Sequence, residues 1–332
     1  MPDEGEPHAA TWMSLHVDPD IWGEDLAPEV RGALGLIAAA IARFEPVKIL
    51  VDEAGSTVAF PPEVDPLPIP ANDLWIRDTG PTFVLPGTGA AGLAGVDFNF
   101  NGWGDKQEHG LDAGVAEVVC EEAQARRLRT ELVLEGGALE VDGEGTAIIT
   151  ESCVLNDNRN PGWSKAEVEV ELKRLLGLEK IIWLPGIKGR DITDGHTDFY
   201  ARFAGPGVVV AGRDDDPDSF DYAVTRRHLK LLEGATDAKG RTLDVRVLPG
   251  PSTVRPDFES DDFAAGYINF YVCNGAVISP EFGDAKADAF AKATLEELFP
   301  DREVVQLNID PIAAGGGGIH CATQQQPREG QA

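Results

Sequence analysis

The feature that most constrains the fold of this chain is a β pattern that recurs at long, nearly even intervals. Each occurrence has polar residues at the head of an apolar strand, usually followed by a turn and a second strand. With Asp78, Glu135, His196, Asn269 and Cys321 as markers, the intervals are 57, 61, 73 and 52 residues. Self-similar units at such periods are typical of propeller-like folds. We therefore predict a pseudo-symmetric closed α/β array of five units, with a generic α/β sandwich as the alternative.

The segments between these strands have the apolar spacing of helices. Ser164 stands where an N-cap is expected. No low-complexity linker divides the sequence, so we expect one catalytic domain over residues 1–332, with a flexible tail after Pro327. The predicted strand covers 47–52, and the predicted helices cover 30–44, 111–129, 164–177, 219–233 and 284–299.

In a closed array, equivalent strand ends meet around a central axis, so polar residues far apart in sequence converge. Three carboxylates, a thiol and an imidazole fit attack on a planar, cationic carbon, which a guanidinium group offers. Carboxylates pair strongly with guanidinium N–H groups, and a thiolate is a good nucleophile at neutral pH. An imidazole can protonate departing ammonia and activate water. The residues concerned are Asp78, Glu135, His196, Asp198 and Cys321.

Cys321 follows four consecutive glycines, which suit sharp turns and close approach of a ligand to the main chain. The other cysteines, Cys120, Cys153 and Cys273, stand in apolar or regular segments and are expected to be buried free thiols. No CxxC pair or zinc-type Cys/His spacing occurs, so we expect no metal. Cys321 is the candidate nucleophile.

Each motif also has a plainer interpretation when taken alone. Asp78 and Glu135 fit turn positions, and His196 in DGHTD fits a satisfied polar group or half of a metal site. The glycine run before Cys321 fits a flexible tail. Only the ordered set favours catalysis.

The formal net charge of −29 argues against nucleic acid and anionic membranes as partners. It suits a cationic substrate, although the same charge also serves solubility. No run of about 18 apolar residues occurs, and the acidic start lacks the features of a signal peptide. We expect a cytoplasmic protein.

Taken together, the motifs resemble the agmatine deiminase family, a branch of the guanidine-modifying group that includes bacterial peptidylarginine deiminase. The resemblance runs over nearly the whole chain and implies a five-bladed α/β propeller without a cofactor. It is carried by MPDEGEPHAATWMSLHVDPDIWG, DLWIRDTGPTFV, VDFNFNGWGDK, LVLEGGALEVDGEGT, DITDGHTDFYARF, GYINFYVCNGAVISPEFGD and GGGGIHCATQQQP.

The resemblance also implies roles for single residues. Cys321 matches the nucleophile that forms a covalent amidino-thioether, and His196 matches the general acid/base. Asp78 and Asp198 match the carboxylates that grip the guanidinium, and Glu135 matches the remaining active-site carboxylate. The expected substrate-binding positions beside them are Trp75, as an aromatic wall, Asn269 and Gly318.

Some positions depart from the family pattern. Ile192 stands where many members have the glutamate that holds the distal amine, and Phe199 replaces the usual asparagine. The segment from Trp12 to Trp22 lacks its usual arginine, and Gly318 replaces a frequent asparagine. These changes concern the far end of the substrate rather than the guanidinium.

The expected reaction is hydrolysis of a small guanidino compound, with agmatine giving N-carbamoylputrescine and ammonia, a step of putrescine and polyamine biosynthesis. One alternative is a different guanidine or a peptidyl C-terminal arginine. Another is an inactive protein that binds a guanidino ligand. A metallohydrolase is the least favoured alternative. A homodimer is a further expectation.

Overall fold

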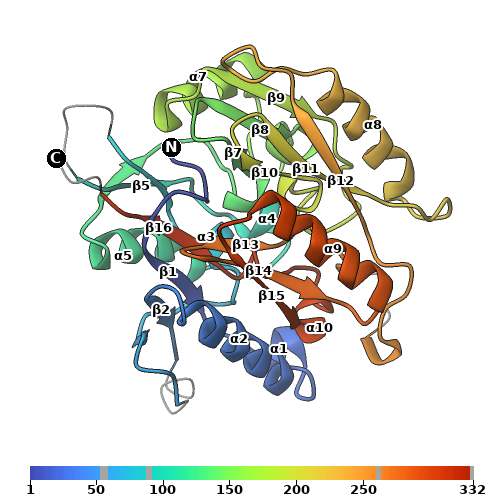
Figure 1. Ribbon diagram of the computed structural model, residues 1–332. Coiled ribbons are helices and arrows are strands. Elements are labelled where there is room, and N and C mark those ends of the chain that lie inside the picture. The colour runs from blue at the N-terminus through green and yellow to red at the C-terminus, as the bar shows by residue number, and fades with distance from the viewer. Residues whose placement is uncertain (53–58, 87–91, 259–262, 330–332) are drawn as a thin grey trace.

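The computed structural model describes residues 1–52, 59–86, 92–258 and 263–329. Within these ranges the strands form five small sheets, which are arranged around a common centre with the longer helices outside them (Figure 1). The expected five-bladed α/β propeller is confirmed. The strands are β1 His8–Ser14, β2 Val47–Leu50, β3 Val64–Leu67, β4 Thr82–Val84, β5 Ala94–Asp97, β6 Arg126–Arg129, β7 Leu139–Val141, β8 Thr146–Thr150, β9 Lys180–Leu184, β10 Ala201–Gly205, β11 Val208–Arg213, β12 Asp244–Pro249, β13 Tyr271–Cys273, β14 Ala276–Glu281, β15 Glu303–Asn308 and β16 Gln324–Pro327.

The sheets share one plan. An inner strand pairs antiparallel with the next strand, which pairs in parallel with a third strand after a helical crossover. Parallel neighbours need such a crossover, which explains why each unit carries a helix. The helices are α1 Pro19–Trp22, α2 Ala27–Ile41, α3 Ile76–Thr79, α4 Gly102–Asp105, α5 Val115–Glu122, α6 Glu151–Val154, α7 Lys165–Leu176, α8 Asp221–Glu233, α9 Ala285–Leu298 and α10 Asp310–Ala313.

The fifth sheet joins the two ends of the described chain. Its order is β16-β1-β2-β3, and β16 supplies the inner strand while β1 pairs antiparallel with it. Arg328 N donates to Pro7 O at 2.7 Å, which extends this contact beyond β16. The predicted flexible tail after Pro327 otherwise lies mostly outside the described residues and stays a prediction.

Predicted helices 30–44, 164–177, 219–233 and 284–299 correspond to α2, α7, α8 and α9. Ser164 caps α7 as expected: its Oγ accepts from Glu167 N at 3.3 Å, and Glu167 Oε2 accepts from Ser164 N at 2.8 Å. α7 ends at Gly177, whose φ of 70° is left-handed. These helices follow local signals closely.

The helix predicted over 111–129 was wrong in its last third. The chain turns at Gln124, whose φ is 53°, and Arg126–Arg129 then runs as strand β6, parallel to β5. Arg127 Nε donates to Asp97 Oδ2 at 2.9 Å across that pair. The charged RRLR sequence is compatible with a helix, and only pairing with β5 makes it a strand.

The apolar faces of the long helices pack on the sheets, and α7 buries Val168, Leu172, Leu175 and Leu176 there. Cys120, Cys153 and Cys273 are buried and free, as predicted. Of the helices described, none combines the length and apolarity needed to cross a bilayer.

Candidate active site

The five marker residues stand immediately ahead of the five inner strands. Asp78 lies in α3 before β4, and Glu135 precedes the short turn Gly136–Ala138 before β7. His196 precedes the turn Thr197–Phe199 before β10, while Asn269 precedes β13 and Cys321 precedes β16. The strand heads meet, so each blade delivers one polar side chain to the same place.

Gly137 marks the point where three of these side chains converge. A Cβ added to Gly137 would lie 2.5 Å from His196 Nδ1, 3.1 Å from Asp78 Oδ1 and 3.2 Å from Asp198 Oδ2. A side chain here would displace His196 and crowd the two carboxylates, since real Cβ atoms essentially never approach another atom more closely than 3.0 Å. Gly137 N also donates to Asp78 Oδ1 at 2.9 Å. The glycine of the LEGG motif is therefore required by the site.

Glu135 is held by a buried arginine. Arg159 Nε donates to both Glu135 carboxylate oxygens, at 2.7 and 3.0 Å, and Arg159 Nη1 donates to Asp194 Oδ2 at 2.7 Å. Burial alone would raise the pKa of Glu135, but Arg159 and His196 lower it to about 2. Glu135 is therefore a fixed anion at neutral pH.

His196 lies between two carboxylates. Its Nε2 is 3.3 Å from Glu135 Oε2, and its Nδ1 is 3.8 Å from Asp78 Oδ2. Burial alone would lower the pKa of His196, yet Asp78, Cys153 and Glu135 raise it well above the usual value. The imidazole is therefore protonated in the free protein and can act as a general acid.

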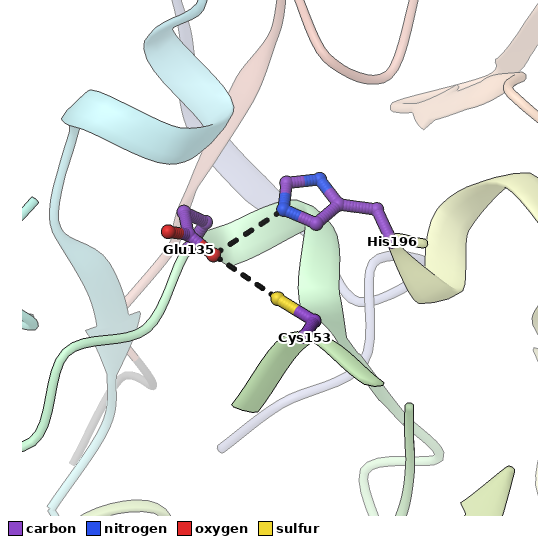
Figure 2. Close-up of side chains that lie close together, drawn as sticks. All are labelled: Glu135, Cys153 and His196. Atoms are coloured by element: carbon purple, nitrogen blue, oxygen red, sulfur yellow. Dashed lines mark hydrogen bonds and ion pairs between the residues drawn. The ribbon is translucent and has the colours of Figure 1, made fainter. Parts of the chain in front are cut away.

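Cys153 is a second thiol at this site. Its Sγ donates to Glu135 Oε2 at 3.2 Å, and Figure 2 shows Cys153 and His196 approaching the same carboxylate. Burial, followed by the charge of Glu135, raises the pKa of Cys153 to about 11. Cys153 is thus a neutral thiol that supports Glu135, beyond the buried apolar role expected for it.

Glu135, Cys153 and His196 offer ligand-type atoms within 4.8 Å of one another, which is a candidate metal spacing (Figure 2). Arg159 already donates to both oxygens of Glu135, so a cation there would face a buried guanidinium at close range. The donor set is poorly suited to a metal, and the expectation of no metal stays a prediction.

Asp78 is oriented by a tryptophan as well as by Gly137. Trp103 Nε1 donates to Asp78 Oδ2 at 3.0 Å, from a turn in α4 in which Trp103 has a φ of 56°. Burial raises the pKa of Asp78, an effect that Glu135 and Asp198 reinforce and His196 opposes. A cationic ligand would relieve this crowding of negative charge.

Asp198 is fully buried and half satisfied. Its Oδ2 lies 2.7 Å from His320 Nδ1 and accepts from Cys321 Sγ at 3.5 Å, while its Oδ1 has no hydrogen-bond partner among the described residues. Burial opposes ionisation, but His320, His196 and Arg202 lower the pKa of Asp198. A buried anionic oxygen without a donor is matched by a guanidinium N–H.

Cys321 is held by Asn269 as well. Asn269 Nδ2 donates to Cys321 Sγ at 3.3 Å, and Asn269 Oδ1 accepts from His320 N at 2.9 Å and from Cys321 N at 3.3 Å. Burial, Asp198 and Asp78 raise the pKa of Cys321 well above the usual value, and hydrogen bonds from Gly318 N and Asn269 partly oppose this. The resting thiol is therefore protonated.

The glycine run owes its composition mainly to neighbouring side chains. A Cβ would lie 2.1 Å from the Trp22 ring at Gly315, 2.2 Å from the Trp75 ring at Gly317 and 2.4 Å from Asn269 Oδ1 at Gly318. The rings of Trp22 and Trp75 lie 5.7 Å apart. At three of the four glycines, the absence of a side chain thus leaves room for Trp22, Trp75 and Asn269.

Two of the positions that depart from the family pattern, Ile192 and Phe199, lie apart from this cluster of charges. Gly318 does not, because its backbone N–H hydrogen-bonds to Cys321; the expectation that these changes concern only the far end of the substrate was wrong for Gly318. Ile192 is 36% exposed, and its carbonyl accepts from Lys106 Nζ at 2.9 Å. Phe199 is half-buried against the core, and a Cβ on Gly266 would lie 3.2 Å from its ring. Neither interacts with Asp78 or Asp198 among the contacts described.

Sequence reasoning missed Arg159, Trp103, Cys153 and His320 as parts of the site. Trp103 and His320 stand inside motifs that were recognised, NGWGDK and GGGGIHCATQQQP, so their motifs were the available signal. Arg159 and Cys153 lie between motifs. Their contribution depends on tertiary contacts with Glu135.

The fold and this cluster together define a deiminase of the guanidine-modifying type. The model of the Porphyromonas-type peptidyl-arginine deiminase family matches residues 1–327, and the chain belongs to this family. Agmatine deiminase from Stutzerimonas stutzeri is 41% identical, and the match covers 98% of this chain and 95% of that protein. Agmatine deiminase from Medicago truncatula is 38% identical, and the match covers 98% of this chain and 96% of that protein.

A solved structure of agmatine deiminase from Enterococcus faecalis superposes with a TM-score of 0.92 at 35% identity, covering 99% of this chain and 95% of that one. The similarity extends over the entire array of blades. The expected family resemblance is thereby confirmed.

Proposed function

We propose that this chain hydrolyses agmatine to N-carbamoylputrescine and ammonia through a covalent intermediate at Cys321. The observation that carries the proposal is the convergence of Asp78, Asp198, His196 and Cys321 around Gly137 and Asn269. Relatives with 41% and 38% identity over nearly their full length are named agmatine deiminases.

In the proposed reaction, Asp78 and Asp198 bind the guanidinium. Burial, together with these two carboxylates, keeps the pKa of Cys321 high. The positive charge of the guanidinium offsets the carboxylates and lowers that pKa, so the thiol releases its proton to solvent as the substrate binds. The thiolate then attacks the guanidinium carbon. Protonated His196 gives its proton to the departing nitrogen, and ammonia leaves from the tetrahedral adduct.

Hydrolysis of the amidino-thioether completes the cycle. Neutral His196 takes a proton from a water molecule, whose oxygen attacks the same carbon. The second tetrahedral adduct collapses with cleavage of the carbon–sulfur bond. The hydroxyl group of the adduct loses its proton to solvent as it becomes the carbonyl of the ureido product. Cys321 is left as a thiolate and His196 as an imidazolium, and Cys321 takes up a proton from solvent as the product leaves. Glu135, held by Arg159, keeps the imidazole in place through both halves.

The decisive measurement is ammonia release from agmatine by wild type and Cys321→Ala side by side. We expect turnover by the wild type and none by the variant, with a mass increase on Cys321 of trapped wild-type enzyme. Turnover by Cys321→Ala would contradict the mechanism. No release from any guanidine would favour the inactive binding protein instead.

Ile192 and Phe199, which replace polar residues usual in the family, favour a second candidate: a deiminase for a guanidine with an apolar or neutral tail, or for a C-terminal arginine of a peptide. A panel of guanidino compounds ranked by kcat/KM separates the two. A clear preference for agmatine removes this candidate. We also propose a cytoplasmic location and a homodimer, and light scattering on the purified protein tests the homodimer.

A further inference from the structure

A carboxylate far from the markers in sequence lies next to the site. Glu4, in the segment before β1, is only 8% exposed. Its Oε1 accepts from Arg202 Nη2 and Val272 N, both at 2.8 Å, and its Oε2 accepts from Arg77 Nη2 at 3.0 Å. The same Oε2 lies 2.9 Å from His320 Nε2. Four donors on one buried carboxylate make Glu4 a fixed anion.

His320 connects this carboxylate to the site. Its Nε2 lies 2.9 Å from Glu4 Oε2, and its Nδ1 lies 2.7 Å from Asp198 Oδ2. A neutral imidazole donates through one nitrogen only, whereas an imidazolium donates through both. Two carboxylates at hydrogen-bond distance on opposite ring nitrogens therefore favour the doubly donating form. The ring is also anchored at its backbone, because Asn269 Oδ1 accepts from His320 N.

The far end of this chain of contacts is the proposed guanidinium site. Asp198 Oδ2 is occupied by His320, which leaves Oδ1 as the buried oxygen without a partner. The direction in which Oδ1 points is thus set by the bond between His320 and Oδ2.

We propose that Glu4 and His320 are positioning residues, forming with Asp198 a carboxylate–imidazole–carboxylate relay that keeps Asp198 ionised and aims its free oxygen at the substrate guanidinium. This inference rests on the function proposed above and extends it to the segment before β1. The carboxylate of Glu4 is enclosed by Arg77, Arg202, Val272 and His320, and of these His320 is the one that hydrogen-bonds to Asp198.

The charges around Asp198 come from several elements. His320 and Cys321 face it from the segment before β16, His196 from its own segment, and Arg202 from β10. Asp78 faces it from α3. Arg202 is in turn neutralised by Glu140, whose Oε2 accepts from Arg202 Nε at 2.7 Å. His320 lies closer to Asp198 than Cys321 does, at 2.7 against 3.5 Å, and contributes most to lowering the pKa of that carboxyl against the effect of burial.

The sign of the effect follows from the relay. In the wild type, an anionic Glu4 favours the doubly donating form of His320, which favours ionised Asp198. Without that anion, Asp198 binds a proton more readily, so guanidinium binding is lost at a higher pH. The test is the pH profile of kcat/KM for agmatine in wild type and Glu4→Gln. We expect the acidic limb to move up by about 0.5–1 pH unit and KM to rise about 10-fold, with a smaller change in kcat.

Glu6→Gln is the matched control, because Glu6 is exposed and its substitution removes the same charge two residues away from Glu4. His320→Gln keeps a donor towards Asp198 but cannot carry charge, so it should show the same shift of the acidic limb and serves as the test if Glu4→Gln folds poorly. Partial recovery in Glu4→Asp would also support the relay. Profiles for Glu4→Gln and His320→Gln that match Glu6→Gln would overturn it.

A second readout does not depend on the substrate. In protein with ¹⁵N-labelled histidine, both ring nitrogens of His320 should carry protons at pH 7 in the wild type, and one should lose its proton in Glu4→Gln. The His320→Gln variant assigns the signals. A neutral His320 ring in the wild type would sink the relay even if agmatine is turned over. A doubly protonated ring without agmatine turnover would instead count against the proposed function alone.

Discussion

Arg159 is the residue that fixes Glu135, and through it His196. Its guanidinium and the Glu135 carboxylate are fully buried, and the pair is 2.7 Å apart. Removing one partner of a buried pair leaves an uncompensated charge, which is costly. The position of Glu135 therefore depends on a residue outside every recognised motif.

We expect Arg159→Met to lower the free energy of unfolding by about 3–5 kcal/mol. It should also reduce kcat for agmatine, because Glu135 loses the donor that orients it against His196. Urea unfolding and initial rates measure the two effects. Arg174→Met is the control, since Arg174 pairs with Glu171 at the surface and its loss should leave both quantities nearly unchanged. Equal effects in the two variants would contradict this role of Arg159.

The markers could be found from sequence because each heads a repeated strand, and repetition is visible without coordinates. The residues that hold the markers were harder to find. Trp103 and Arg159 contact the marker of their own blade from segments that lie far from it in sequence, and His320 contacts Asp198 from another blade. The glycines before Cys321 were recognised, but their physical reason was not. Contact with Trp22, Trp75 and Asn269 is a property of the folded site.

Among the elements, α7 shows how far local signals reach. Ser164 and Glu167 form a reciprocal cap and Gly177 ends the helix in a left-handed conformation, so both ends are set by residues next to them. β6 shows the opposite case, because Arg126–Arg129 becomes a strand only by pairing with β5. The prediction was right for α7, whose ends are set by adjacent residues, and wrong for β6, which forms a strand by pairing with β5.

Ser164→Ala should lower the free energy of unfolding by about 1 kcal/mol, because Glu167 N loses its acceptor. Gly35→Ala in α2 should act in the opposite direction, raising it by up to about 1 kcal/mol, since a Cβ at Gly35 meets no atom within 4 Å. Chemical unfolding of both variants checks the pair. Stabilisation by Ser164→Ala would show that the cap observed here does not matter.

At the scale of the whole molecule, buried acids give stability a maximum at mildly acidic pH. Burial raises the pKa of Asp112 to about 7 and that of Asp221 to about 6. Such groups bind protons more tightly when folded, so stability rises as the pH falls from about 7 to 4. The pKa values of Glu135 and Asp194 are instead lowered to about 2, so their contribution is lost as the pH falls from about 4.5 to 2.

We therefore expect the urea midpoint to be highest near pH 4–5 and to fall on both sides. The net charge of −29 and the raised pKa of His196 also lower the stability of the folded protein as the pH rises above 7. His228, whose pKa burial lowers to about 4, opposes the trend. The free energy of unfolding of Asp112→Asn, taken relative to that of the wild type, should be higher at pH 8 than at pH 4 by on the order of 3 kcal/mol. A midpoint that keeps rising above pH 7 would contradict this account.

The sheet shared by β1 and β16 has a consequence for how the chain can be rearranged. Its two strands lie side by side, and Arg328 bonds to Pro7. A circular permutant could join these ends by a short linker and open instead in the exposed segment 215–218, between β11 and α8. All five strand heads would keep their neighbours. The order of the blades along the chain can thus change, while the residues at the heads of the inner strands still meet at the same place.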